Sequence, residues 1–398
     1  MIQDARLTEA LGLSARTVET IVPEAELVRK LDRGRPLRLK LGIDPTSPTI
    51  HIGNAVQLWI LRHLQDLGHL PVLILGDYTA TVGDPSGKDK TRPMLTTEQI
   101  ESNLATWQDQ IGSILDMERV EIRRNSEWFA PMTFLDVLGL SDRMTVQQMM
   151  ERDSFQNRYE ANEPISVREF LYCLMQAWDS VAVKADVELG GQDQTFNLTV
   201  ARKFMQQEGV EPQVNLLTPL LEGTDGQAKM SKSLGNSIGV QDDPKTQFGM
   251  VMRISDEQIR KYAELATDLT DEQIAGFTGQ NPRDAKLSVA EALVTRYHGA
   301  EAGAGQREEF LRVFSRKDAP TEIPEKDAGP PADDGQWWIV ALLKACGFAK
   351  STSEARRLVE GGGVHLDEER VQDWQARIAL TGGEVLRVGR RRYARLRI

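Results

Sequence analysis

The 398-residue sequence has few of the features that mark a secreted or membrane-embedded protein. Its two cysteines, Cys173 and Cys346, stand far apart, so a disulfide framework is not expected and a reducing compartment fits. No apolar run reaches the roughly 18 residues that a membrane helix needs. The first residues mix acidic and basic side chains and show no apolar stretch, so no secretory signal peptide is predicted. We therefore expect a cytoplasmic protein with no membrane partner.

Positive charge is also scarce, except at one end of the chain. The formal net charge is −11, yet residues 336–398 carry 12 basic and 7 acidic side chains, a local balance of +5 that leaves −16 for the rest. An acidic body with a basic tail indicates an anionic partner for the tail. The length predicts two or three domains.

The first half of the chain alternates strand and helix patterns. Residues 1–35 look helical, alternating leucines over residues 37–43 predict a strand, and a helix follows from residue 49 or 50 to Gly68. A continuously apolar second strand, residues 72–75, is typical of a parallel sheet that is covered on both faces. This order predicts a doubly wound α/β domain whose ligand cleft lies beyond the strand C-termini.

The tetrapeptide His51-Ile52-Gly53-Asn54 stands where the first helix begins. A helix N-terminus has unpaired amide donors and a positive partial charge, so it receives phosphate groups well. His51 adds a side-chain N–H donor, and Gly53 lets a flat ring lie against the backbone. In isolation, a capping or packing role for His51 is the commoner interpretation.

The segment Lys229-Met230-Ser231-Lys232-Ser233 lies between glycine-containing turns and is predicted to be a loop. Two lysines three residues apart can bring flexible point charges onto a phosphate chain. Taken alone, such a cluster is more often a solvated surface loop. Its combination with the upstream tetrapeptide favours a nucleotide site.

A polar stripe marks the predicted helix of residues 166–183. Tyr172, Gln176 and Asp179 are spaced i, i+4 and i+7 and therefore share one face of an otherwise apolar helix. Solvent-facing stripes usually contain lysine and glutamate, so this face more readily lines a pocket. A further helix is predicted over residues 97–116, and Gly190-Gly191 at a strand end allows a sugar to approach the backbone.

Together these segments resemble the class I aminoacyl-tRNA synthetases, and within them the bacterial tyrosyl-tRNA synthetases that contain Lys-Met-Ser-Lys-Ser. The resemblance runs over nearly the whole chain. It implies a Rossmann-like catalytic domain, activation of L-tyrosine by ATP, and transfer of tyrosine to tRNA(Tyr). It also implies a homodimer with contacts between residues 125 and 164, ATP as a substrate with Mg²⁺, and no tightly bound metal.

The resemblance assigns roles to individual residues. Asp84, Tyr172 and Gln176 would hold the α-ammonium group, Asp179 the phenol, and Asp193 the ribose. The implied catalytic residues are Thr46, His51, Asn54, Lys88, Arg92, Lys229 and Lys232. Those implied for tyrosine are Gly42, Asp44, Asp84, Tyr172, Gln176, Asp179 and Gln194, and those for ATP are His51, Gly53, Asn54, Gly191, Asp193, Met230 and Lys232.

Three positions depart from the family pattern. Asn54 stands where most members have a second histidine, and it keeps an amide N–H donor. Trp178 replaces a tyrosine and preserves an aromatic ring. Lys40 occupies a position where many members place a tyrosine against the substrate phenol, so a second phenol contact is left unassigned.

The same resemblance divides the chain into a catalytic domain (1–235), a helical anticodon-proximal domain (236–318), a linker (319–335) and an S4-like α+β RNA-binding domain (336–398). Residues 387–397 contain six arginines and no acid, a composition that favours RNA backbone over a solvated strand. The RNA-binding candidates are Arg356, Arg357, Arg390, Arg391 and Arg392.

Two other functions stay open from the sequence. A related synthetase or nucleotidylyltransferase could use another substrate such as tryptophan; Asp179 argues against an indole, whereas Trp178 and Lys40 leave room for one. A catalytically silent RNA-binding paralogue is the second. Such a paralogue would be expected to lose cleft residues, and here His51 and Asp84 are present with both motif lysines.

Overall fold

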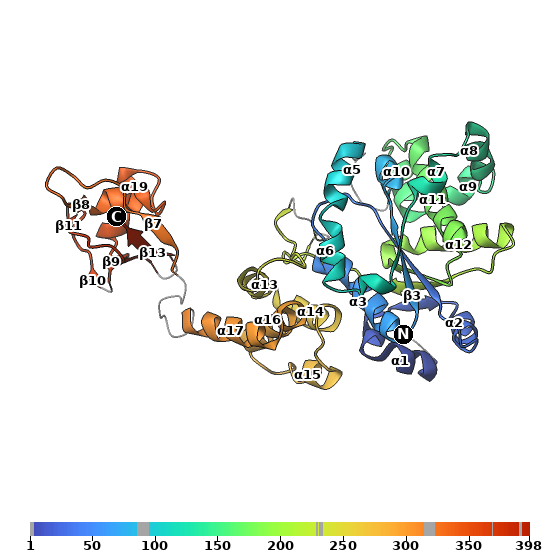
Figure 1. The fold of residues 1–398 in the computed structure, drawn as a ribbon, viewed down its shortest axis with the longest axis horizontal. Coiled ribbons are helices and arrows are strands. Elements are labelled where there is room, and N and C mark those ends of the chain that lie inside the picture. The colour runs from blue at the N-terminus through green and yellow to red at the C-terminus, as the bar shows by residue number, and fades with distance from the viewer. Residues whose placement is uncertain are drawn as a thin grey trace. The chain divides into compact units, whose positions relative to one another are not determined.

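The computed structural model describes residues 4–85, 95–227, 230, 234–313, 323–367, 369–389 and 392–398. The chain forms two compact units, one ending at Gly303 and the other beginning at Ala304 (Figure 1). Within the described ranges, no helix is long and apolar enough to cross a membrane.

A six-stranded sheet with the order β1-β6-β5-β2-β3-β4 forms the centre of the first unit. All neighbouring strands are parallel except the edge strand β1, which pairs antiparallel with β6. The strands are β1 (Thr20–Val22), β2 (Arg38–Ile43), β3 (Leu70–Leu75), β4 (Glu121–Arg124), β5 (Val187–Gly191) and β6 (Val214–Thr218). The strand order reverses between β2 and β5, so the predicted doubly wound fold is confirmed and its ligand crevice belongs at the carboxyl ends of these two strands.

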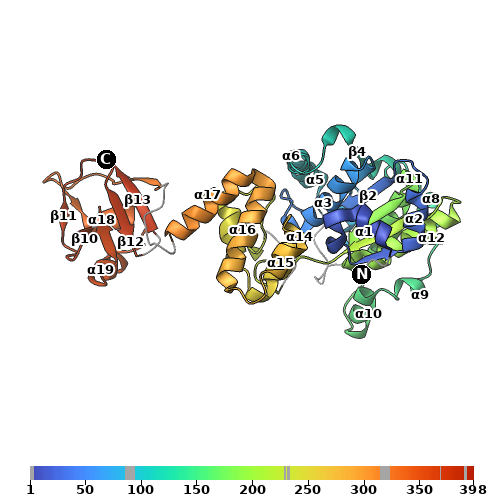
Figure 2. The same cartoon turned by 90° about the horizontal axis from the view of Figure 1, so that it is seen from below.

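Helices and short 3-10 turns cover the sheet and extend the unit beyond it (Figure 2). In chain order they are α1 (Ala5–Leu11), η1 (Gly12–Thr17), α2 (Glu24–Leu31), α3 (Ile52–Asp66), α4 (Thr79–Val82), α5 (Thr97–Leu104), α6 (Trp107–Gly112), η2 (Met117–Arg119), α7 (Ser126–Phe129), α8 (Phe134–Ser141), α9 (Val146–Met149), α10 (Asp153–Glu160), α11 (Val167–Val183), η3 (Gln192–Gln194), α12 (Thr195–Gln207), α13 (Pro244–Val251), η5 (Asp256–Gln258), α14 (Ile259–Ala266), α15 (Asp271–Ala275), α16 (Pro282–His298) and α17 (Ala300–Leu311). The last helix crosses the boundary between the two units.

Strand β2 shows how the sheet is buried on both faces. Leu39 and Leu41 belong to the main apolar core, which also contains Leu58 and Leu61 of α3. The intervening residue, Lys40, lies on the opposite face and contacts α11. Side chains alternate between the faces of a strand, so a single strand serves two helical layers.

The region of residues 97–116 forms two helices, so the prediction of one continuous helix there is wrong. The break follows Leu104. The hydroxyl of Thr106 donates to the carbonyl oxygens of Asn103, at 3.0 Å, and of Pro48, at 2.6 Å. A threonine hydroxyl that bonds nearby carbonyls offers the backbone an alternative to helix, and here it also ties the break to the loop after β2. The prediction of helix for residues 1–35 is incomplete as well, because it lacks β1.

The second unit is a small α+β module with its own apolar core. Its elements are β7 (Glu325–Asp327), β8 (Trp337–Trp338), α18 (Ile339–Ala345), α19 (Thr352–Glu360), β9 (Val364–Leu366), β10 (Glu369–Arg370), β11 (Arg377–Ile378), β12 (Val385–Val388) and β13 (Arg392–Arg397). Five strands form a sheet with the order β10-β9-β12-β13-β7. The predicted α+β module is thus present, and the finer division of the chain into four segments stays a prediction.

Candidate active site

A cavity of about 210 Å³ opens at the carboxyl ends of β2, β5 and β6, where the strand order reverses. Its lining includes the predicted residues Gly42, Asp44, Thr46, His51, Gly53, Asn54, Asp84, Tyr172, Gln176, Asp179, Gly191, Asp193 and Gln194. The sequence therefore predicted which residues gather here, and the geometry bears on what each can do. The predicted Lys88, Arg92, Lys229 and Lys232 lie outside the described residues.

His51 caps the N-terminus of α3. Its Nδ1 accepts a hydrogen bond from the backbone N–H of Asn54 at 3.3 Å, and the Asn54 Oδ1 accepts from the backbone N–H of His51 at 3.5 Å. A neutral imidazole whose Nδ1 is an acceptor carries its proton on Nε2. The capping interaction and the predicted donor role are therefore compatible, since one nitrogen caps the helix while the other is a donor.

The segment after the motif at residues 229–233 is hydrogen-bonded to the start of α3. The backbone N–H of Ile52 donates to the carbonyl of Ile238 at 2.9 Å, and that of Val240 donates to Ile50 at 3.0 Å. Met230, the one described residue of the motif at 229–233, is buried, and a methyl group built on Gly53 would lie 3.5 Å from its sulfur. Met230 and the start of α3 are thus neighbours in space.

Side chains from α5 and α6 hold the loop that joins β2 to α3. The amide of Asn103 donates to the carbonyl of Pro45 at 2.7 Å. Gln110 donates to the carbonyl of Pro48 at 2.8 Å and accepts from the backbone N–H of Ile50 at 2.7 Å. These contacts fix the path of the chain into His51, and they join segments that no local sequence pattern connects.

Asp179 of α11 is a buried carboxylate in the lining of the cavity. The indole N–H of Trp128 donates to its Oδ1 at 2.9 Å, and the amide of Asn125 donates to its Oδ2 at 3.4 Å. Burial raises the pKa of Asp179 to about 7, against the lowering effects of the Lys40 ammonium and these two hydrogen bonds. A buried carboxylate is stabilised in its charged form by each further hydrogen-bond donor, such as a hydroxyl group.

Tyr172 points its hydroxyl at the neighbouring Asp44. The hydroxyl donates to Asp44 Oδ2 at 3.0 Å, and the Thr79 hydroxyl donates to the other carboxylate oxygen at 2.7 Å. Burial, with the negative charges of Asp44 and Asp84 nearby, raises the pKa of Tyr172 well above its ordinary value. Tyr172 therefore stays neutral and retains oxygen lone pairs that can face a cation.

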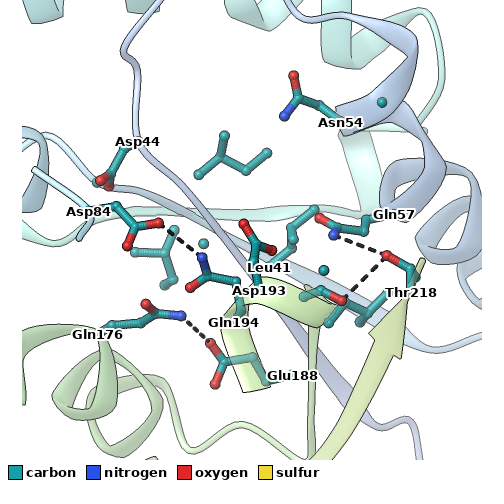
Figure 3. Close-up of a pocket in the computed structure, with 18 of the residues that line it drawn as sticks. Leu41, Asp44, Asn54, Gln57, Asp84, Gln176, Glu188, Asp193, Gln194 and Thr218 are labelled. Atoms are coloured by element: carbon teal, nitrogen blue, oxygen red, sulfur yellow. Dashed lines mark hydrogen bonds between the residues drawn. The ribbon is translucent and has the colours of Figure 1, made fainter. Parts of the chain in front are cut away.

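Asp84 lies across from Gln194, whose amide donates to its Oδ2 at 2.9 Å (Figure 3). A buried arginine, Arg152, approaches the other oxygen of Asp84 to 3.5 Å and donates to the sulfur of Cys173 at 3.1 Å. Arg152 was not predicted as a site residue, because no local sequence pattern distinguishes it from the other arginines of the chain.

Gly191, where β5 ends, has no room for a side chain. A methyl group there would lie 2.7 Å from Asp193 Oδ1 and 2.8 Å from Leu220. A larger residue would displace the Asp193 carboxylate, which lines the cavity. This close approach is consistent with the predicted sugar-binding role of the pair.

The Lys40 side chain does not line the cavity, so it cannot contact a bound phenol directly. Its ammonium group is fully buried and lies 2.9 Å from the carboxylate of Glu188 in β5. Glu188 lines the cavity and was not identified from the sequence, although a charged residue within the apolar run of β5 is a visible signal.

The candidate RNA-binding arginines belong to the second unit. Arg356 stacks over the Trp374 ring at 4.2 Å and pairs with Glu360 at 2.7 Å, whereas Arg392 lies 5.7 Å from the Phe348 ring centre. Arg357 is exposed on α19. The predicted Arg390 and Arg391 lie outside the described residues.

Comparison with protein families identifies two segments. Residues 32–315 match the family described as tRNA synthetases class I (W and Y), and residues 337–378 match the S4 domain. The first match contains the whole cavity, and the second falls within the small α+β module.

Curated relatives match over almost the full length. The tyrosine–tRNA ligase of Thermotoga maritima is 45% identical over 98% of this chain and 97% of its own length. The tyrosine–tRNA ligase of Symbiobacterium thermophilum is 46% identical, again over 98% of this chain and 97% of its own.

Solved structures share the fold of the larger unit. The tyrosyl-tRNA synthetase of Archaeoglobus fulgidus, solved with L-tyrosine, is 26% identical with a TM-score of 0.61, covering 76% of this chain and 99% of that one. A C-terminally truncated mitochondrial tyrosyl-tRNA synthetase of Aspergillus nidulans has the same TM-score at 23% identity, covering 76% of this chain and 93% of that one.

Proposed function

The chain belongs to the class I tRNA synthetases of the tryptophan and tyrosine family, and from this premise we propose how its residues carry out the reaction of a tyrosine–tRNA ligase. Such an enzyme joins L-tyrosine to the 3′ end of its tRNA in two steps and consumes ATP. The proposal assigns one end of the cavity to tyrosine, the other to ATP, and the second unit to tRNA.

Tyrosine lies with its phenol at Asp179 and its α-ammonium group among Asp84, Tyr172 and Gln176. The arrangement of Asp179 supports this, because two donors already hold its carboxylate and leave an acceptor direction for a hydroxyl. A site built to bind a hydroxyl rejects an analogue that lacks it, since a buried acceptor is then left unpaired. Gly42 offers open space beside Asp44, and Gln194 approaches the substrate carboxylate.

ATP lies against the start of α3, with its ribose at Gly191 and Asp193 and its base beside Gly53 and Met230. The helix N-terminus and the Nε2–H of His51 point positive charge at the phosphates. Asn54 and Thr46 add further donors. Lys88, Arg92, Lys229 and Lys232 supply cations, and Mg²⁺ arrives with ATP as part of the substrate.

The activation step requires no general base, because the tyrosine carboxylate is already ionised. One carboxylate oxygen attacks the α-phosphorus, the bond to the bridging oxygen breaks, and pyrophosphate leaves with the electron pair. The terminal ribose hydroxyl of tRNA then attacks the acyl carbon, and the bond from that carbon to the adenylate oxygen breaks. AMP leaves with the electron pair, and the hydroxyl proton passes to its phosphate group. The protein contributes positioning, and it stabilises the negative charge that grows on the leaving phosphates.

The second unit and the helical region before it carry tRNA in this proposal. An S4 domain match and the local charge of +5 over residues 336–398 support an RNA role for the tail. Arg356, Arg357, Arg390, Arg391 and Arg392 contact the RNA backbone. The division into a catalytic domain (1–235), a helical anticodon-proximal domain (236–318), a linker (319–335) and an RNA-binding domain (336–398) belongs to the same proposal.

The protein acts as a homodimer in the cytoplasm. Large apolar side chains are exposed between residues 125 and 164, where the dimer contact is predicted: Phe134 is 77% exposed, Leu135 76% and Tyr159 67%. Such a surface is typical of a protein–protein interface. Both cysteines are free and buried, which is compatible with a reducing compartment.

The observation that carries the proposal is that one cavity joins the cap of α3 to the buried acceptor Asp179. The test is amino-acid-dependent exchange of pyrophosphate into ATP, measured with each of the twenty amino acids. Tyrosine alone should support rapid exchange. Tryptophan-dependent exchange would show a different specificity, and RNA binding without any exchange would show a catalytically silent RNA-binding protein.

A further inference from the structure

Two charged residues face each other at the centre of the sheet. Lys40 of β2 and Glu188 of β5 are direct partners in the parallel register of these strands. Their charged groups lie 2.9 Å apart, and the side chains are 0% and 1% exposed. They therefore form a fully buried ion pair at the point where the strand order reverses.

Every donor of the Lys40 ammonium has an acceptor. Besides the Glu188 carboxylate, the backbone carbonyl of Gln176 accepts from it at 3.0 Å and the Ser180 hydroxyl oxygen at 2.6 Å. The Ser180 hydroxyl in turn donates to Glu188 at 3.0 Å, and the Gln213 amide donates to the same carboxylate. The pair thus joins β2 and β5 to one turn of α11.

Stability alone does not explain such a pair. Removing two charges from water costs several kcal/mol per ion, and apolar residues of similar volume are often as stable or more so. A buried ion pair is better understood by what it orients. Both members of this pair contact Ser180 and Gln176, and of these two residues Gln176 lines the cavity.

The side-chain amide of Gln176 donates to Glu188 Oε1 at 3.5 Å (Figure 3). The amide oxygen of Gln176 accepts from Asn197 at 2.7 Å. These two contacts fix the orientation of the amide, with its nitrogen at Glu188 and its oxygen at Asn197. Without Glu188 the amide could rotate and present its NH₂ group to a substrate ammonium, where a donor would face a donor.

The hydrogen bonds continue from Gln176 to Asp84. Asn197 also donates to the Gln194 side-chain oxygen at 2.8 Å, and the Gln194 amide donates to Asp84 at 2.9 Å. A continuous series of contacts therefore joins the buried pair to the two side chains, Gln176 and Asp84, that the proposed function assigns to the α-ammonium group.

We propose that Lys40 and Glu188 are positioning residues for amino-acid recognition, which hold Gln176 and, through Asn197 and Gln194, Asp84 so that their oxygens face the substrate ammonium. This inference rests on the proposed function. It gives Lys40 an indirect role in place of a second phenol contact.

The test compares two double variants of the full-length enzyme. Lys40→Met with Glu188→Met removes both charges and the acceptor for Gln176, and the Michaelis constant for tyrosine should rise about tenfold with that for ATP unchanged. Lys40→Met with Glu188→Gln also removes both charges but keeps an amide oxygen for Gln176, so it should return most of the affinity for tyrosine. A purely structural pair predicts that both variants behave alike.

Two competitive ligands separate the ammonium contact from the rest of the site. Tyramine keeps the phenol and ammonium of tyrosine, and 3-(4-hydroxyphenyl)propionate keeps the phenol and carboxylate. In the Met/Met variant tyramine should bind about tenfold more weakly, while the propionate binds as it does to wild type. Equal losses for both ligands, or none, would overturn the inference.

Two further variants control for the general effect of losing a buried ion pair and for a failure of the double variants to fold. Lys30→Met breaks another buried pair, with Asp186 at 3.5 Å, and should leave tyramine affinity unchanged. Ser180→Ala removes one contact of the network with little change of volume, so it should weaken tyramine binding about threefold even if the double variants do not fold. An unchanged affinity in Ser180→Ala would count against the inference. A wild-type enzyme without tyrosine-dependent exchange would instead refute the proposed function.

Discussion

Replacement of Asp179 by asparagine should reduce discrimination between tyrosine and phenylalanine. The substitution keeps the shape of the side chain and the acceptor for Trp128, whose indole N–H lies 2.9 Å from Oδ1. It places an NH₂ group where the carboxylate now accepts from Asn125, at 3.4 Å, and would accept from a phenol. The phenol then meets a donor in place of a charged acceptor.

The expected fall in kcat/KM for tyrosine follows from the free energy of a hydrogen bond to a charged group. Such a bond contributes about 1.5–3 kcal/mol, so kcat/KM for tyrosine should fall roughly 10- to 150-fold. Phenylalanine makes no such bond, and its kcat/KM should stay the same or rise slightly, because no buried carboxylate is left facing a ring. The ratio of the two values should therefore fall by the same factor as the tyrosine value.

The assay is pyrophosphate exchange with each amino acid at about pH 8, where Asp179 with a pKa of about 7 is ionised. Asp186→Asn is the matched control. Asp186 is also buried and charged, pairing with Arg35 at 2.7 Å outside the cavity lining, so its replacement can lower stability but should leave the ratio intact. A wild-type ratio in Asp179→Asn would refute the assignment of the phenol to this residue.

Four other outcomes are expected. Burial raises the folded-state pKa of Asp179 above its unfolded value, so the protonated form adds stability that is present at pH 4 and lost as the pH rises through about 7. The unfolding free energy of Asp179→Asn relative to wild type should thus increase by on the order of 4 kcal/mol between pH 4 and pH 8 in denaturant titrations, and a constant difference would contradict the burial argument. Lys232→Ala should slow adenylate formation about 10²-fold or more in pre-steady-state kinetics with tyrosine affinity nearly unchanged, because the contact forms mainly in the transition state; a matching loss of tyrosine binding would exclude that role. Truncation at Gly335 should abolish aminoacylation and spare pyrophosphate exchange, whereas equal loss of both would make the tail a structural element. Phe134→Asp with Leu135→Asp should weaken a dimer about 100-fold or more in analytical ultracentrifugation, and an unchanged dimer would place the contact elsewhere.

The sequence predicted those parts of the site that local patterns encode. His51 caps the helix that follows the first parallel strand and its loop, and Tyr172, Gln176 and Asp179 repeat at helical spacing on one face. Both features can be recognised without tertiary information. The order of strand, helix and strand likewise predicted the doubly wound sheet, because parallel strands need crossover helices.

The missed parts depend on contacts between distant segments. Lys40 and Glu188 meet only because β2 and β5 are neighbours in the sheet, and no spacing along the chain indicates this. Arg152 reaches Asp84 from the start of α10, and Trp128 reaches Asp179 from α7. Such groups stand out only when packing shows them to be buried and charged or aimed at a buried carboxylate.

A crystal structure with a non-hydrolysable analogue of tyrosyl-adenylate would test the central claim most directly. We predict the phenol oxygen within about 3 Å of an Asp179 carboxylate oxygen, the ammonium at Asp84 and Gln176, and the phosphate analogue at the N-terminus of α3 beside His51. An analogue bound in the reverse direction, or with its phenol away from Asp179, would contradict the account.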